Sequence, residues 1–520
     1  MGSSAARPSG RLASLVVGAA AALSRLLGFA RDVGLAVLFG AGPVGDALLI
    51  ALRLPNLVRR VLGEGGLHTA FVPVMLGEQA TGGEEAARRF SGQVILSLVL
   101  LSALLAVLVQ LLALPLVLLL GAPAQTAEIA SLALVLAFPM VAGSGLAAVA
   151  SAILATKHKF ALAAWSGVLV NVTLVLALVW LKIHPVEPAQ AAMILAGLSG
   201  AAGLVQGLVL VLVVRISDFE PLWTRPRWTP AMGQFVTLCV PGLVIAAGSQ
   251  LAFLILVSQA GQHSGLVSQL YFADRVTQLP FGFIAAVLAI VVLPAISRDA
   301  LASDQAAFGR GMDRAMLLSL LLALPASAGL IVLADPISHV LFEHGAFDHA
   351  AQQAARDALA GFALALPALA VGRVSAHGFF AHGRIKEPFM ATLAGLAGVL
   401  ILCLLLRQSG QADARAFALS LSAGAGIEML AGLGFLLVGL GWRPERTLLR
   451  DLSLVLMATA VMLAGVTVIA WLIDPMMPDQ PALGIEILSL LGQCLGGCAV
   501  YGICVHAFGL SKTRHNMQTR

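Results

Sequence analysis

Long apolar runs follow one another along almost the whole chain, and this feature limits the fold more than any other. In lipid every backbone polar group must find a partner within the protein, so only helices and closed barrels cross a membrane. Barrel strands have about 10 residues with alternating polarity, whereas a membrane helix needs about 20 apolar residues. These runs, with 59% hydrophobic residues and a mean hydropathy of +0.95, predict an all-α polytopic membrane protein.

We expect 14 transmembrane helices, because each apolar segment is long enough to cross about 30 Å of hydrocarbon. The expected segments are about 11–38, 43–77, 87–120, 126–155, 160–182, 189–214, 230–260, 264–297, 310–333, 351–381, 388–406, 414–440, 448–473 and 484–509.

The distribution of Lys and Arg predicts the orientation of these segments. With the N-terminus inside, the inside connections carry 20 basic residues and the outside connections carry only Lys182, Arg407 and Arg415. Because basic residues favour the cytoplasmic side, we expect both termini in the cytoplasm and an even number of spans.

The chain also resembles itself at an offset of about 222–228 residues. LIALRLPNLVRRVLGEGGLHTAFVPVM parallels LYFADRVTQLPFGFIAAVLAIVVLPAI, so that Arg53 falls on Arg275. A later pair of segments places Pro139 on Pro367. Six spans per repeat give both units the same orientation, which predicts two six-helix lobes in a parallel pseudo-twofold repeat. The expected parts are a first lobe at 1–218, a second at 219–442, and two C-terminal helices at 443–520.

Charged residues gather in the first two segments, although only 11% of the chain is charged. SRLLGFARD carries Arg25, Arg31 and Asp32 at the end of the first apolar run. The second segment adds six polar residues: Asp46, Arg53, Asn56, Arg59, Arg60 and Glu64. A charge at mid-membrane costs about 2.5–3.5 kcal/mol on insertion scales, so such residues usually face a cavity or a partner.

Two interpretations of this cluster stay open. The carboxylates could form ion pairs that only hold the first two segments together. Alternatively, five arginines against three acids, with Arg275 and Arg373 added from the second lobe, suit a multiply charged anion. Guanidinium groups match phosphate oxygens bidentately and stay protonated when desolvated.

The remaining polar residues give weaker indications of function. Asn171 lies in a glycosylation-like triplet inside an apolar span, so we interpret it as packing. His339, His344 and His349 lack a clear set of metal ligands. Glu428 fits an ion-coupling site or a hydrogen-bonded helix contact. We find no catalytic motif in its required context, no cofactor signature, and basic residues too dispersed to predict nucleic-acid binding.

Several stretches resemble the MurJ (MviN) family, the lipid II flippases of bacterial cell-wall synthesis. The matching text is SRLLGFARD, FGAGPVGDA, LPNLVRRVLGEGGLHTAFVPV, YFADRVTQLPFG, LFEHGAFD and HGRIKEP, and the resemblance covers about residues 11–510. It implies a fold of the multidrug/oligosaccharidyl-lipid/polysaccharide (MOP) exporter superfamily, with a cationic cavity between two lobes. It also implies that the last two helices flank a groove for a lipid tail.

The resemblance further implies a function and a site. The expected function is to flip lipid II from the inner to the outer leaflet of the bacterial cytoplasmic membrane by alternating access. The implied partners are lipid II and membrane lipids, with proteins of cell-wall synthesis as further candidates. The implied substrate-binding and transport residues are Arg25, Arg31, Asp46, Arg59 and Arg275, followed by Arg60, Glu64 and Ser268. One departure is Gln278, where family members often carry a carboxylate.

Three competing functions remain at this stage. A flippase for another polyprenyl-diphosphate-linked glycan, or a multidrug exporter of the same superfamily, would share the repeat. A membrane enzyme acting on polyprenyl diphosphates would need acidic metal ligands or a catalytic His/Asp set. A scaffold for cell-wall assembly would tolerate loss of Arg31 or Arg275.

Overall fold

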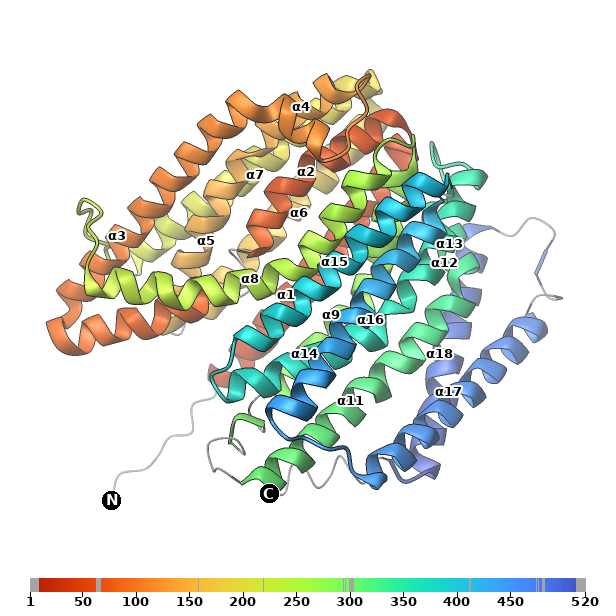
Figure 1. Ribbon diagram of the computed structural model, residues 1–520. Helices are drawn as coiled ribbons and strands as arrows, with labels where there is room; N and C mark the ends of the chain where they lie inside the picture. The colour runs from red at the N-terminus through yellow and green to blue at the C-terminus, as the bar shows by residue number, and fades with distance from the viewer. Residues whose placement is uncertain are drawn as a thin grey trace. The chain divides into compact units, whose positions relative to one another are not determined.

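The computed structural model describes residues 9–61, 67–157, 159–217, 219–292, 294, 296–298, 304–410, 413–473, 475, 477–478 and 482–510. Throughout these residues the regular structure is helical, with no strand (Figure 1). The chain forms two compact units, Met1–Ser268 and Gln269–Arg520. The fold is therefore the all-α, polytopic one that the apolar runs predict.

In its described residues, the first unit contains eight helices and the start of a ninth. They are α1 (Ser9–Phe39), α2 (Pro43–Val61), α3 (Leu67–Leu119), α4 (Ala127–Ala137), α5 (Pro139–Thr156), α6 (Phe160–Ile183), α7 (Pro188–Ile216), α8 (Pro230–Ala260) and α9 (Leu266–Val287). Within this unit α5 lies beside α7, α1 beside α6, and α8 against α3 and α2 (Figure 1).

The second unit contains most of α9 and the helices after it. They are η2 (Leu288–Val292, a π-helical turn), α11 (Gln305–Val332), α12 (Ala334–Phe342), α13 (His349–Ala363), α14 (Ala365–Ala381), α15 (Lys386–Ser409), α16 (Ala414–Gly439), α17 (Arg446–Ile473) and α18 (Leu483–Ala507). Here α15 pairs with α16, and α17 with α18 (Figure 1).

Several helices break where the sequence prevents a continuous hydrogen-bond ladder. α3 bends at Gly83, whose φ of 74° is accessible to glycine without strain. α4 gives way to α5 at Pro139, which lacks the N–H that would continue the helix. α13 and α14 break in the same way at Leu364, three residues before Pro367. The two segments that the internal repeat pairs are thus both interrupted near their matched prolines.

Close helix contact and aromatic packing hold the first unit together. A Cβ built on Gly143 of α5 would lie only 1.9 Å from the carbonyl oxygen of Gly203 on α7, so the two backbones touch. At the other side of the core, Phe71 and Phe90 stack with ring centroids 5.5 Å apart. Phe235 of α8 meets both rings edge-on. These contacts fix α8 to the kinked α3.

Ten helical stretches among the described residues are long and apolar enough to cross a membrane. They cover the third to sixth and the ninth to fourteenth expected segments. The first, second, seventh and eighth expected segments fall on α1, on α2 with the start of α3, on α8 and on α9. The count of 14 spans therefore stays a prediction. So do the lobe boundaries at residues 218 and 442, since the compact units divide at residue 268.

Candidate functional site: intramembrane arginines

Arg31 lies half-buried on α1, where two neighbours hold its guanidinium. Its Nε and Nη2 donate to the same carboxylate oxygen of Asp32, at 3.0 and 2.7 Å. Its Nη1 donates to Asn171 Oδ1 of α6 at 3.3 Å. Asn171 in turn donates to the carbonyl and hydroxyl oxygens of Ser24 at 2.9 and 3.2 Å. The arginine is thus oriented by an ion pair and by a polar link between α1 and α6.

The other basic residues of the first unit have their own surroundings. Arg53 is only 6% exposed, and its guanidinium carbon lies 3.7 Å from the centre of the Phe253 ring on α8. Such a cation–π contact stabilises a charge without neutralising it. Arg59 is exposed and donates to Asn56 Oδ1 at 3.4 Å. Arg25 is exposed on α1, and Arg60 is half-buried near the end of α2.

Asp46 of α2 is buried and hydrogen-bonded to the first turn of α9. One carboxylate oxygen accepts from the backbone N–H of Gly265 at 2.6 Å. The other accepts from the Ser268 backbone N–H at 2.8 Å and from its hydroxyl at 2.6 Å. A carboxylate at a helix N-terminus satisfies N–H groups that lack helical partners and interacts favourably with the helix dipole. Asp46 and Ser268 therefore meet, and their contact fixes where α9 begins.

In the second unit, the surroundings of Arg275 on α9 are aromatic and amide-rich. Its guanidinium carbon lies 4.6 Å from the centre of the Tyr271 ring, and its Nη1 donates to Gln278 Oε1 at 3.5 Å. Gln278 also donates to a carboxylate oxygen of Asp274. Position 278, where the sequence resemblance leads us to expect a carboxylate, is thus an amide that contacts both neighbours. Arg373 of α14 is exposed, and its guanidinium carbon lies 5.3 Å from the centre of the Phe281 ring.

These contacts bear on both interpretations of the charged cluster. Asp32 does form an ion pair with Arg31, as the structural interpretation expects. Asp46, in contrast, accepts from backbone and hydroxyl donors at the start of α9 rather than from an arginine. Glu64 lies outside the described residues. The geometry can present guanidinium groups to an anion, and the roles of all eight predicted site residues stay predictions.

Sequence reasoning missed Asn171, which it interpreted as packing. The residue is a hydrogen-bonding partner of Arg31 and joins it to Ser24. An uncharged amide in an apolar run was the available signal, because such groups cross-link membrane helices. Glu428 accepts from Thr392 Oγ1 at 2.7 Å, which makes it a hydrogen-bonded contact between α15 and α16.

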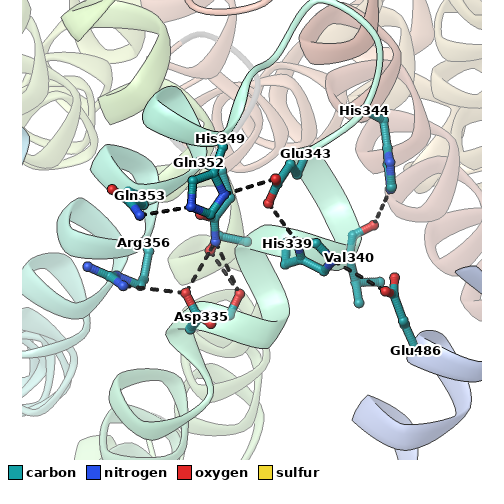
Figure 2. Close-up of polar contacts among 11 residues, drawn as sticks. Asp335, His339, Val340, Glu343, His344, His349, Gln352, Gln353, Arg356 and Glu486 are labelled. Carbon is teal, nitrogen blue, oxygen red and sulfur yellow. Dashed lines mark hydrogen bonds and ion pairs between the residues drawn. The ribbon is translucent and has the colours of Figure 1, made fainter. Parts of the chain in front are cut away.

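The three histidines near the start of α13 belong to a polar cluster (Figure 2). His339 Nδ1 lies 2.6 Å from Glu343 Oε2, and its Nε2 lies 3.3 Å from Glu486 Oε1 on α18 (Figure 2). His349 Nδ1 lies 2.9 Å from the second Glu343 oxygen, and its Nε2 lies 2.9 Å from Gln353 Nε2. Among the described residues no group of His, Cys, Asp and Glu has the arrangement of a metal site.

The protonation of this cluster follows from its geometry. Both ring nitrogens of His339 face carboxylate oxygens, and both can donate only when the ring is an imidazolium. The hydrogen bond to Glu343 raises the pKa of His339, against an opposing effect of burial. Burial raises the pKa of Glu343, but the hydrogen bonds from His339 and His349 outweigh it and leave that pKa below its ordinary value. When His339 is protonated it pairs with Glu343 and, through Glu486, links α12 to α18.

A protein family and several known proteins are similar to this chain in sequence. The family model described as "Lipid II flippase MurJ" matches residues 35–491. A relative named "Probable lipid II flippase MurJ" from Rhizobium meliloti is 30% identical over 97% of this chain and 94% of its own length. A relative named "Lipid II flippase MurJ" from Burkholderia cenocepacia is 30% identical over 75% of this chain and 76% of its own.

Solved structures agree with the sequence comparisons. A structure titled "Lipid II flippase MurJ, inward closed conformation" is similar with a TM-score of 0.76 and 26% identity, over 95% of this chain and 98% of that one. An inward-facing multidrug resistance MATE transporter of the MOP superfamily is similar with a TM-score of 0.66 over 80% of this chain and 94% of its own. At 15% identity, that second likeness shows the fold alone. The family match across most of the sequence places the chain in the lipid II flippase MurJ family.

Proposed function

We propose that this protein flips lipid II from the inner to the outer leaflet of the bacterial cytoplasmic membrane. The observation that carries the proposal is the match along nearly the whole chain to relatives and a solved structure that are named lipid II flippases. These names describe transporters, so the membrane-enzyme interpretation is set aside. With its many apolar helices, the protein is a multi-pass inner-membrane protein, and we propose that both termini are cytoplasmic.

The proposed mechanism is alternating access through a cationic central cavity. Lipid II joins a sugar-peptide head to a polyprenyl tail through a diphosphate, and the head cannot cross hydrocarbon unaided. Arg31, Arg59 and Arg275 would replace the water around the diphosphate with charge-assisted hydrogen bonds. The tail would stay in lipid beside α17 and α18. Each lobe would keep its internal contacts while the cavity opens first to one side and then to the other.

The contacts of Arg31 support this assignment. Asp32 and Asn171 approach it from two sides and fix the plane of its guanidinium. An arginine held in this way loses little conformational freedom when it binds a phosphate, because its planar fork is already oriented. Arg53 and Arg275 lie over aromatic rings. These cation–π contacts stabilise the positive charge of each guanidinium without neutralising it. Such residues are therefore suited to receive an anion.

A flippase for another polyprenyl-linked glycan, or a multidrug exporter of the superfamily, is the second candidate. The MATE-like fold supports it, although the basic residues within α1 and α2 favour a diphosphate over a drug cation.

Depletion of the protein in cells that have no other flippase tests the choice. If lipid II is the substrate, lipid II accumulates on the cytoplasmic face and its exposure on the outer face falls. Unchanged sidedness of lipid II, with export of a drug or another glycan lost instead, contradicts the proposal. Re-expression of the wild-type chain serves as the control.

A further inference from the structure

An extended segment, residues 219–229, connects α7 to α8 and is called the strap below. Its sequence, FEPLWTRPRWT, has no regular secondary structure. α7 before it is long and apolar enough to cross a membrane, and α8 after it falls on the seventh expected span, so we place the strap at a membrane surface. The predicted orientation makes this the cytoplasmic surface.

The first half of the strap is fixed to α3. The Leu222 backbone N–H donates to the Arg88 carbonyl at 3.0 Å, and Arg88 Nε donates to the Glu220 carbonyl at 2.6 Å. Arg215 at the end of α7 donates to Glu220 Oε1 at 3.1 Å. A Cβ on Gly92 would lie 1.9 Å from the Leu222 carbonyl oxygen, so only glycine lets the strap cross α3 at this point. These bonds hold the strap in place.

The second half presents aromatic and basic side chains outward. Trp223 is 50% exposed and Trp228 is 78% exposed. Arg225 and Arg227, between them in the sequence, are also exposed. Neither arginine forms an ion pair or side-chain hydrogen bond with another residue in the described part of the chain. Thr229 then caps α8 by accepting from the Met232 N–H at 3.2 Å, so the segment is fixed at its end as well.

We propose that the strap is a docking surface for anionic lipid headgroups of the adjacent leaflet. Two largely exposed indoles are unfavourable in bulk water, whereas the headgroup layer accommodates their apolar faces and their N–H donors. Basic residues beside an anionic leaflet are attracted to phosphate. The alternation of Trp and Arg supplies both interactions within six residues.

The surroundings of the strap favour a phosphate on its outer side. Lys157 lies nearby, with its Nζ 5.4 Å from the centre of the Phe219 ring, but it forms an ion pair with Glu84 at 3.7 Å. The positive charge on the outer side of the strap therefore comes from Arg225 and Arg227. The pocket at the end of the strap, with a volume of about 380 Å³, is lined by Glu78, Glu85 and Arg89 among others and has no excess of positive charge. Lipid phosphates therefore bind along the exposed arginines rather than in this pocket.

Quenching of tryptophan fluorescence by brominated lipid tests the proposal on the full chain. The protein is purified in an uncharged detergent and titrated with brominated phosphatidylglycerol or brominated phosphatidylcholine. We expect selective quenching by the anionic lipid, and loss of that selective component in the Trp223→Phe/Trp228→Phe variant. The Arg225→Gln/Arg227→Gln variant should need ~30-fold more phosphatidylglycerol, since each basic residue contributes roughly fivefold.

The matched control is Arg407→Gln/Arg415→Gln, which removes two exposed basic residues, one from the last turn of α15 and one from the first turn of α16. It has the same change in net charge and should titrate like the wild type. The proposal is overturned if both lipids quench equally, or if the strap arginine variant behaves like the wild type. It is also overturned if neither lipid quenches the strap tryptophans, a result that would indicate a soluble protein partner instead.

Discussion

Arg31 depends for its orientation on an uncharged residue in another helix. Asp32, its neighbour in sequence, accepts from one edge of the guanidinium, while Asn171 of α6 accepts from the other. Asn171 is itself held by the Ser24 carbonyl. A partly buried polar network of this kind loses stability when one member loses its partners. Asn171 is therefore a positioning residue for the arginine most central to our proposal.

We expect Asn171→Ala to weaken both transport and stability. The substitution leaves Arg31 Nη1 and the Ser24 carbonyl without this partner, which costs about 1–3 kcal/mol. Thermal unfolding of the purified protein measures the loss of stability, and the sidedness of lipid II measures transport. Thr173→Ala on the same helix is the control, because the half-buried Thr173 hydroxyl donates to the Leu169 carbonyl of its own helix, and among the described residues its side chain has no hydrogen bond to another helix. Equal effects of the two substitutions would contradict the role of Asn171.

The charged residues that matter could be identified from the sequence more reliably than the partners they contact. Arg31 and Arg275 stand out because a guanidinium in an apolar run is costly without a cavity or partner. Asp46, Arg53 and Arg60 are spaced by seven residues, which favours one shared face of a straight helix. Asp46 nevertheless bonds to the start of α9, 222 residues away. Contacts over such separations depend on the packing of whole helices, which a local pattern does not specify.

Helices were predicted well where a single apolar run ended in clear signals. The expected segment 160–182 matches α6, Phe160–Ile183, and the expected segment 414–440 matches α16, Ala414–Gly439. Interruptions were harder to see. The expected segment 126–155 is two helices, α4 and α5, separated at Phe138. Hydrophobicity sets the length of a segment, but a proline can end one helix and begin another inside it.

The contact between α12 and α18 should weaken as pH rises. The pKa of His339 lies above its ordinary value of 6.5. The ring therefore stabilises the contact fully below about pH 6.5, and the contribution is lost as pH rises through the raised pKa. The pKa of Glu343 lies below its ordinary value of 4.5. Its carboxylate therefore stabilises the contact fully above about pH 4.5, and this contribution is lost only as pH falls through the lowered pKa.

Hydrogen exchange measures this dependence directly. As pH rises from about 6.5 through the raised pKa of His339, amide protection in residues 339–343 and 483–490 should fall in the wild type after correction for intrinsic rates. In His339→Gln it should be low and independent of pH. His344→Gln is the control, because within the described part of the chain the His344 ring contacts the Val340 carbonyl, at 3.0 Å, and no carboxylate. Wild-type pH dependence in His339→Gln would exclude the proposed link.

At the scale of the whole molecule, the sequence predicted the class of fold and the family, and the comparisons confirm both. The first unit holds Arg31, Arg53 and Arg59, and the second holds Arg275. Within each unit, the arginines contact amides, aromatic rings or a single acid. The proposed cavity needs residues from both units, and no local pattern in either repeat determines how the two repeats face each other.

The sidedness of lipid II in cells that carry Arg31→Ala or Arg275→Ala at normal protein levels tests the central claim most directly. Loss of a charge-assisted contact to the diphosphate should reduce outward delivery about ten- to hundredfold, with lipid II retained on the cytoplasmic face. Arg407→Ala, in the last turn of α15, should leave delivery unchanged. Normal delivery in both Arg31→Ala and Arg275→Ala would contradict the assignment of these arginines to the substrate.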